Sequence, residues 1–240
     1  MHYFHIEYLL LPCCLVVGCR QQAPRQYVNP TPASTQKEHA KVSDYFEDVS
    51  GIGELSSLDF SEEAKSASFR EVVAEVQQRC GVPSQPLGQI NGGVCFPAEQ
   101  AVIELMLDDK HQAYLEKGCS IFVCKINGGT GGARDIVGLL PTTDKLTVVE
   151  AVGTDGVNYD IYPDDIIAWL RTLEKEEPFI LLGAGTDFLV IRFTGEVKNP
   201  KKIARSIVKI CPTFKEQPGD PISDLVQELQ AAREVTIWWD

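Results

Sequence analysis

The aspartate carboxylates are the side chains of this sequence that are most able to bind a metal ion or take part in catalysis. Those near expected turns and strand ends include Asp155, Asp160, Asp164, Asp165, Asp187, Asp220 and Asp240. Gathered carboxylate oxygens hold Mg²⁺ or Ca²⁺, so a metal-assisted hydrolase using Asp155, Asp160 or Asp187 is one hypothesis. No spacing matches an EF-hand loop, and aspartate commonly forms turns and begins helices. We therefore expect structural roles for most of these residues and predict no metal site.

Nucleophilic catalysis by serine or cysteine needs a histidine base. His111 is the one histidine in the expected domain, and its neighbours Asp108, Asp109 and Lys110 indicate an exposed helical face. We therefore expect no catalytic role for His111 and no histidine-based zinc site. Whether the chain is an enzyme stays open at this point, and the pattern leans against it.

Two glycine-rich segments raise the question of a phosphate-binding loop. Residues 128–132 (GGTGG) lack the following Lys-Ser/Thr and lead into an expected strand, whereas a phosphate loop leads into a helix. Residues 183–185 (GAG) join two expected strands, which does not fit a Rossmann site. The sequence predicts flexible hairpins at both places, and no cofactor.

The negative net charge of the chain helps to exclude some classes of binding partner. The net charge is −12 and the sequence pI is about 4.8, which argues against nucleic acid because phosphate binding needs clustered Lys and Arg. The densest basic group is Lys198, Lys201, Lys202 and Arg205, which we expect on the solvated face of a helix.

The first 63 residues look like an export segment followed by a tether. Residues 8–18 are apolar and end at Cys19, and the stretch before it resembles a bacterial lipobox, so we expect lipid attachment at Cys19 and a place in the cell envelope. The preceding segment lacks Lys and Arg, which keeps plain secretion and a cytoplasmic location as alternatives. Residues 20–43 are polar and typical of a flexible tether. Residues 44–63 are acidic with scattered apolar residues, and the sequence leaves open whether this part docks on the domain or stays loose. The expected domains are therefore 1–19 (signal), 20–63 (tether) and 64–240 (folded domain).

Five cysteines lie beyond the export segment: Cys80, Cys95, Cys119, Cys124 and Cys211. An odd number cannot all pair within one chain, and the sequence leaves the pairing open. Cys119 and Cys124 belong to an apolar strand, where a separation of five places them on opposite faces. We expect small buried side chains.

The hydrophobic pattern predicts an α+β domain. Expected helices span 66–80, 98–117, 163–175, 200–210 and 221–232, and expected strands span 94–96, 119–126, 136–140, 146–152, 179–182, 188–193 and 235–239. Pro97 is expected to open the second helix. The order from residue 146 is close to a ferredoxin-like split β-α-β arrangement. We therefore expect a mainly antiparallel sheet with helices packed on one face.

Several segments together resemble the bacterial family catalogued as domain of unknown function 4253. They are residues 138–144 (GLLPTTD), 153–160 (GTDGVNYD), 165–170 (DIIAWL), 185–187 (GTD), Cys211-Pro212 and the terminal WWD. The resemblance covers residues 138–240 and extends, at most, back to residue 98. It implies no catalytic residue, because the family's description names no activity.

These observations favour an envelope-tethered domain that binds a partner protein, with an immunity or inhibitor protein as one concrete form, since acidic domains can neutralise basic toxins. A lipid anchor would be its contact with the membrane. The binding face that we expect comprises Asp155, Asn158, Tyr159, Asp160, Asp187 and Trp239. Adjacent Trp238 and Trp239 should point to opposite faces of a strand.

Overall fold

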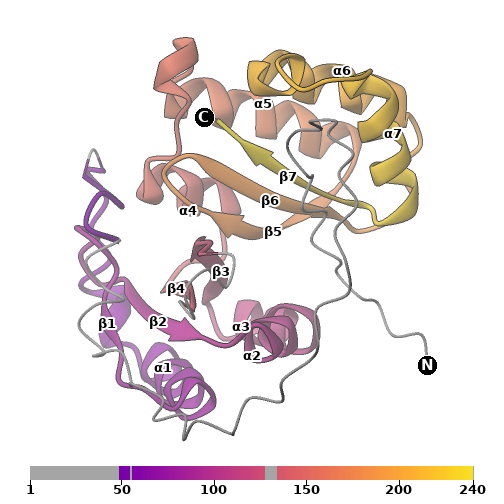
Figure 1. Ribbon diagram of the computed structural model, residues 1–240. Helices are drawn as coiled ribbons and strands as arrows, with labels where there is room; N and C mark the ends of the chain where they lie inside the picture. Colours follow the sequence, from indigo (N-terminus) through magenta and orange to yellow (C-terminus); the bar gives the residue numbers. More distant parts are fainter. Residues whose placement is uncertain (1–48, 55, 128–133, 240) are drawn as a thin grey trace, which may run out of the picture. The chain divides into compact units, whose positions relative to one another are not determined.

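The computed structural model describes residues 49–54, 56–127 and 134–239. Within them lies a seven-stranded sheet in the order β1-β2-β4-β3-β5-β6-β7 (Figure 1). The strands are β1 (Gln85–Pro86), β2 (Val94–Ala98), β3 (Ser120–Lys125), β4 (Asp135–Leu140), β5 (Phe179–Ala184), β6 (Phe188–Phe193) and β7 (Glu234–Trp238). Neighbouring strands run antiparallel except β3 and β5, which are parallel. The α+β prediction is confirmed.

The helices begin and end largely where the sequence indicates. They are α1 (Ala67–Cys80), α2 (Gln100–Glu104), α3 (His111–Glu116), α4 (Lys145–Val152), α5 (Pro163–Glu176), α6 (Pro200–Ile210) and α7 (Pro221–Ala231). In α1, the Ser66 side chain accepts a hydrogen bond from the Phe69 amide, and Gly81 ends the helix in a left-handed conformation. Both are standard helix-capping devices.

Helices cover both faces of the sheet, so the expectation of helices on one face is wrong. One core contains Phe69 of α1, Tyr114 of α3 and Val137 of β4. The other core contains Leu170 of α5, Ile207 of α6 and Ile136 of β4. Adjacent residues of one strand thus serve opposite cores, as the pleat of a strand requires. Figure 1 shows α1–α3 on one side of the sheet and α4–α7 on the other.

The segment Leu146–Val152 forms helix α4, and the strand expected there is absent. The Asp144 side chain accepts a hydrogen bond from the Leu146 amide, and Gly153 ends the helix with φ of 77°. A short, mostly apolar run cannot be assigned to strand or helix by periodicity alone. In this segment Asp144 and Gly153 cap the two ends and stabilise the helix. The ferredoxin-like order depended on that strand and is therefore not confirmed.

The second expected helix begins later and is less regular than expected. Pro97 lies inside β2, and α2 begins at Gln100. A π-helical segment, Leu105–Lys110, separates α2 from α3. Such segments are rare and shift the direction in which the next residues point. In this chain the next residue is His111.

The five expected buried cysteines are found as free thiols, four buried and Cys80 half-buried. Cys119 and Cys124 belong to different cores, which confirms their expected places on opposite faces. Burial raises the pKa of the Cys95 thiol to about 12, so that thiol stays protonated near neutral pH. The cysteines are packing residues in this structure.

Residues 49–54 and 56–60, which lie in the segment expected between tether and domain, pack against the domain. Val49, Ile52 and Phe60 are buried. The Gln89 amide donates to the Ile52 carbonyl, and the Phe60 amide donates to the Asn91 carbonyl. None of the helices within the described ranges is long and apolar enough to cross a bilayer.

Replacing Gly88 by alanine should destabilise the protein strongly, because Gly88 has φ of 54° and an added Cβ would lie 2.3 Å from the Ile52 carbonyl oxygen. Gly81→Ala is the matched control: its φ is 68°, but nothing lies within 4 Å of the added atom. Urea denaturation should show a loss of at least about 3 kcal/mol for Gly88→Ala and about 1 kcal/mol for Gly81→Ala. Equal losses would mean that residues 49–60 do not pack as described.

Candidate functional site

Segments from the second half of the chain meet around the turn between β5 and β6. Three successive carbonyls of this turn accept hydrogen bonds. The Thr154 hydroxyl donates to Gly185 over 2.7 Å, the Asp155 amide donates to Thr186 over 2.9 Å, and the Trp239 amide donates to Asp187 over 2.9 Å. The two Gly-Thr-Asp tripeptides of the sequence are thereby joined directly. Thr154 is fully buried, so its hydrogen bond holds the turn firmly.

The terminal tryptophan supports this arrangement from inside. Trp239 is 3% exposed, and its indole N–H donates to the Ile210 carbonyl over 2.9 Å. Gly156 lies directly on the indole ring, since an added Cβ would come within 2.4 Å of it. Trp238 belongs to the opposite core and stacks on Phe188 with ring centroids 5.4 Å apart. The expected opposite orientation of the two tryptophans is confirmed.

The loop above Trp239 is a rigid reverse turn. Gly156 and Ile161 exchange backbone hydrogen bonds of 2.9 and 3.2 Å. The Asp155 side chain accepts from the Val157 amide, and Asp160 adopts a left-handed conformation with φ of 56°. Such conformations are accessible to aspartate. Asp155 and Asp160 thus act first as turn formers.

Most of the expected binding face lies together, but its members differ in exposure. Asn158 and Asp160 are exposed, Asp155 and Asp187 are half-buried, and Trp239 is buried beneath them. Tyr159 is half-buried, and its hydroxyl donates to the Glu216 carboxylate over 3.1 Å.

Three residues that are prominent in the structure were not predicted from the sequence. Val157 and Tyr162 are 57% and 53% exposed, and Thr154 is buried. The repeated tripeptide was the available signal for Thr154. Nothing in the local sequence marks an apolar residue as exposed.

The carboxylates do not assemble a metal centre in the described part of the chain, where no group of three or more possible ligands was found. Asp165 accepts from the Tyr162 amide and caps α5, and Asp220 accepts from the Ile222 amide and caps α7. These are the helix-start roles expected from the sequence. Asp240 and the segment 128–133 lie outside the described residues, as does Cys19.

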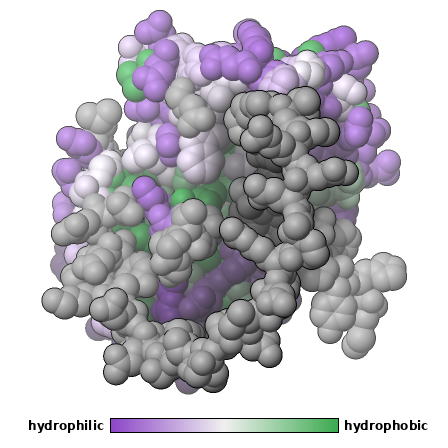
Figure 2. Space-filling model, viewed as in Figure 1, coloured by the Kyte–Doolittle hydropathy of each residue, from purple (hydrophilic) through white to green (hydrophobic). Residues whose placement is uncertain are grey.

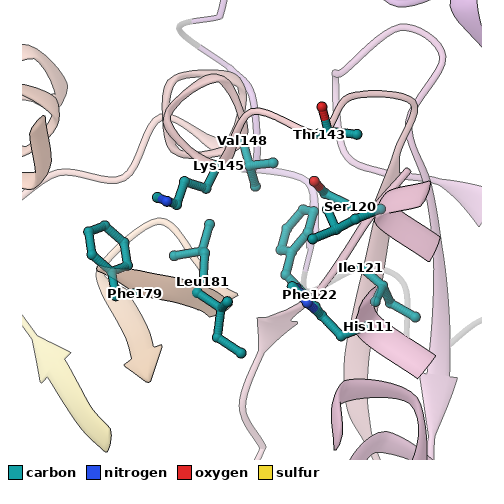
Figure 3. Close-up of a pocket in the computed structure, with 11 residues that line it drawn as sticks. His111, Ser120, Ile121, Phe122, Thr143, Lys145, Val148, Phe179 and Leu181 are labelled. Atoms are coloured by element: carbon teal, nitrogen blue, oxygen red, sulfur yellow. The ribbon is translucent and has the colours of Figure 1, made fainter. Parts of the chain in front are cut away.

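A second feature lies near the opposite ends of β3 and β5. A cavity of about 80 Å³ separates the two strands, and Figure 3 shows Phe179 and Leu181 of β5 on one side and Ser120 and Phe122 of β3 on the other. His111 also lines the cavity. A cavity of this size fits a few water molecules and is too small for most organic substrates.

His111 is buried, so its expected place on an exposed face is wrong. It is 8% exposed and hydrogen-bonds to the backbone of Leu181, while burial lowers its pKa despite that bond. The nearby Arg192 also lowers the pKa, although Asp108 and Glu234 form ion pairs with that guanidinium. The preceding π-helical segment turns His111 toward the sheet, where it joins α3 to β5.

Removing the Thr154 hydroxyl should loosen the site. Thr154→Val keeps the shape of the side chain and leaves the buried Gly185 carbonyl without its donor, so chemical denaturation should show a loss of about 1–3 kcal/mol. Thr172→Val is the matched control, because the Thr172 hydroxyl donates to the Ala168 carbonyl at the exposed surface of α5. The control should change stability by less than about 0.5 kcal/mol. Similar losses in both variants would contradict the account.

Acid should weaken the fold through His111. Its pKa is lowered in the folded state from 6.5, so the unfolded chain takes up a proton more readily as pH falls through that value, and stability is lost. The free energy of unfolding should therefore fall more between pH 7.5 and 5.5 in the wild type than in His111→Gln. Comparing the two proteins isolates the contribution of His111, because every other ionisable group is present in both. An equal pH dependence would be the contradicting result.

Comparison with known proteins bears on the second half of the chain. A family model described as domain of unknown function (DUF4253) matches residues 136–240. No curated protein and no solved structure matches the chain. The matched range contains α4–α7, β5–β7 and the whole network around the β5–β6 turn. The resemblance seen in the sequence is therefore confirmed: residues 136–240 match the DUF4253 family model, which is consistent with a domain of this family in the C-terminal part of the chain.

Proposed function

We propose that this protein works by binding a partner protein through the exposed side chains of its 155–164 loop. We call this the loop surface and define it by Val157, Asn158, Asp160, Tyr162 and Asp164, all of them exposed. Val157 and Tyr162 are two of three large apolar side chains exposed in the described part of the chain. Exposed apolar and aromatic groups that lie together are characteristic of binding surfaces.

The rigidity of this loop also supports the proposal that it binds a partner protein. The loop is closed by the paired hydrogen bonds of Gly156 and Ile161 and rests on the buried Trp239. A partner would therefore not have to order the loop, and a preorganised surface binds at lower entropic cost. Tyr162 directly follows Ile161 at the N-cap of α5, and a tyrosine offers a large contact area with few rotatable bonds.

The negative charge around the loop surface indicates that its partner would be basic. Asp160 and Asp164 flank the apolar side chains, and the whole chain carries a net charge of −12. A complementary surface would present Lys or Arg around a shallow apolar pocket, and opposite charges would speed the encounter. Figure 2 shows that hydrophilic side chains dominate the upper part of that view, where Figure 1 places α5 and α6. An immunity or inhibitor protein directed at a basic toxin is one concrete form of this proposal.

The anchor is a separate part of the proposal. A lipid on Cys19 would hold the domain at the cell envelope, and the support for it is the lipobox-like sequence that ends at this residue. Metal-assisted hydrolysis receives no support from the described carboxylates. Asp155 and Asp165 hold backbone amides of their own loop and helix, which are structural uses.

Truncating the loop surface should abolish partner capture. The full chain is used as bait in three forms: wild type, Val157→Ala/Tyr162→Ala, and Leu105→Ala. Leu105 is the matched control, because it is the third exposed apolar side chain, at 40%, and lies far away in the sequence. The protein captured by wild type and control should bind the double variant at least about 30-fold more weakly, which corresponds to about 2 kcal/mol.

Two results would overturn the proposal. One is a captured protein that binds the double variant as tightly as the wild type. The other is the absence of any protein captured by both wild type and control across extracts. Binding should also weaken as salt is raised if Asp160 and Asp164 steer the partner.

A further inference from the structure

The parallel pair β3 and β5 creates a crevice at one edge of the sheet. After β3 the chain returns along β4 on one side, and after β5 it returns along β6 on the other side. The carboxyl ends of both strands, Lys125 and Ala184, open toward the same edge because the strands are parallel. Adjacent strands whose connections leave in opposite directions form a crevice, and such crevices bind ligands in open α/β sheets.

A cavity of about 130 Å³ lies at this crevice. Its lining combines Phe188 and Trp238, whose rings stack on each other, with three polar residues, Lys125, Thr186 and Asp187. Gly51 and Ile52, from the segment that packs over the domain, also line it. Small-molecule sites use a few placed polar groups beside apolar and aromatic side chains to fix the orientation of a ligand.

The charged groups of this cavity have opposite sign and come from different strand ends. Lys125 ends β3, and Asp187 belongs to the turn after β5. Among the residues that the structure describes, no ion pair joins Lys125 to Asp187, although Asp187 has another partner in the chain. A carboxylate has about four acceptor positions, so it can accept a further donor beside an existing one. The cavity thus offers one cationic and one anionic group.

The turn that carries Thr186 and Asp187 is fixed in place. Its three carbonyls accept hydrogen bonds from the Thr154 side chain and from the amides of Asp155 and Trp239. Those bonds engage the backbone of the turn, and Thr186 and Asp187 both line the cavity. A site whose polar groups are already positioned loses little entropy on binding.

We propose that this cavity binds a small zwitterion, a free α-amino acid of the size of glycine or alanine. Its carboxylate would meet the Lys125 ammonium and the Thr186 hydroxyl, and its ammonium would meet the Asp187 carboxylate. An apolar cavity of about 150 Å³ holds benzene, a molecule of six heavy atoms, so glycine and alanine match the available volume. This site is separate from the loop surface and does not depend on a protein partner.

The test follows the indole N–H signal of Trp238 in the full chain by ¹⁵N–¹H NMR, with the three tryptophan signals assigned from single Trp→Phe variants. Glycine and L-alanine should shift the Trp238 signal to saturation and leave the Trp169 signal in place. Acetate and methylammonium, which each carry half of the zwitterion, should bind at least about tenfold more weakly, since each lacks one charged contact.

Substitutions then separate the two charged groups. Lys125→Met and Asp187→Asn should each weaken alanine binding at least about tenfold. Lys201→Met and Asp224→Asn remove one charge of each sign at exposed positions on other elements and should leave binding unchanged.

The proposal is overturned if alanine at tens of millimolar does not move the Trp238 signal. It is also overturned if acetate alone binds as tightly as alanine, which would show a simple anion site. Retained binding in both Lys125→Met and Asp187→Asn would overturn it as well. A variant that does not fold is recognised by the narrow chemical-shift dispersion of its NMR spectrum. In that case the binding of the four ligands to the wild-type protein decides whether the proposal holds.

Discussion

The buried hydrogen bond from the Thr154 hydroxyl to the Gly185 carbonyl is the interaction on which the rest of the candidate region depends. It joins the end of α4 to the turn after β5, and the neighbouring bond from the Asp155 amide to Thr186 extends the connection. A buried carbonyl without a donor would be costly, so this pair fixes both segments. The turn then presents side chains to the cavity below, and the loop above presents side chains to solvent.

Trp239 completes this arrangement because it serves both segments at once. Its amide holds the Asp187 carbonyl, while its ring supports Gly156. A larger residue than glycine could not approach the indole so closely. The indole N–H is satisfied by Ile210 at the end of α6, so β7, α6 and the loop are connected through one side chain. Three of the segments that resemble the DUF4253 family, residues 153–160, 185–187 and the terminal tryptophan pair, therefore meet in space.

The sequence predicted elements well where local signals agreed and poorly where long-range packing decided. Helix α1 has Ser66 and Gly81 at its ends and an amphipathic stripe between them, so its pattern has one interpretation. The run from Leu146 to Val152 is mostly apolar, and Val148, Val149, Ala151 and Val152 are buried in the helix. Periodicity could not distinguish such a short run from a buried strand. His111 shows the same limit, because its charged neighbours indicated exposure while the π-helical segment turned it inward.

For the candidate region, local sequence identified the turn-forming aspartates but not how they are held. Asp155 and Asp160 were recognisable from their residue type and spacing. The contact of Gly156 with Trp239 joins residues 83 positions apart, and such pairs cannot be inferred from one sequence. The cavity between Lys125 and Asp187 likewise depends on the parallel pairing of β3 and β5, which the sequence did not indicate.

The central claim is that the 155–161 loop is a preorganised structure held from the β5–β6 turn. Native-state hydrogen exchange by NMR tests it most directly, because the amides of Asp155, Gly156 and Ile161 each donate within this network. We expect these three amides to exchange slowly, with an opening free energy close to that of the neighbouring strands β5 and β6. Exchange at the rate of an unstructured peptide at all three positions would contradict the account, since it would mean that the loop opens independently of the domain.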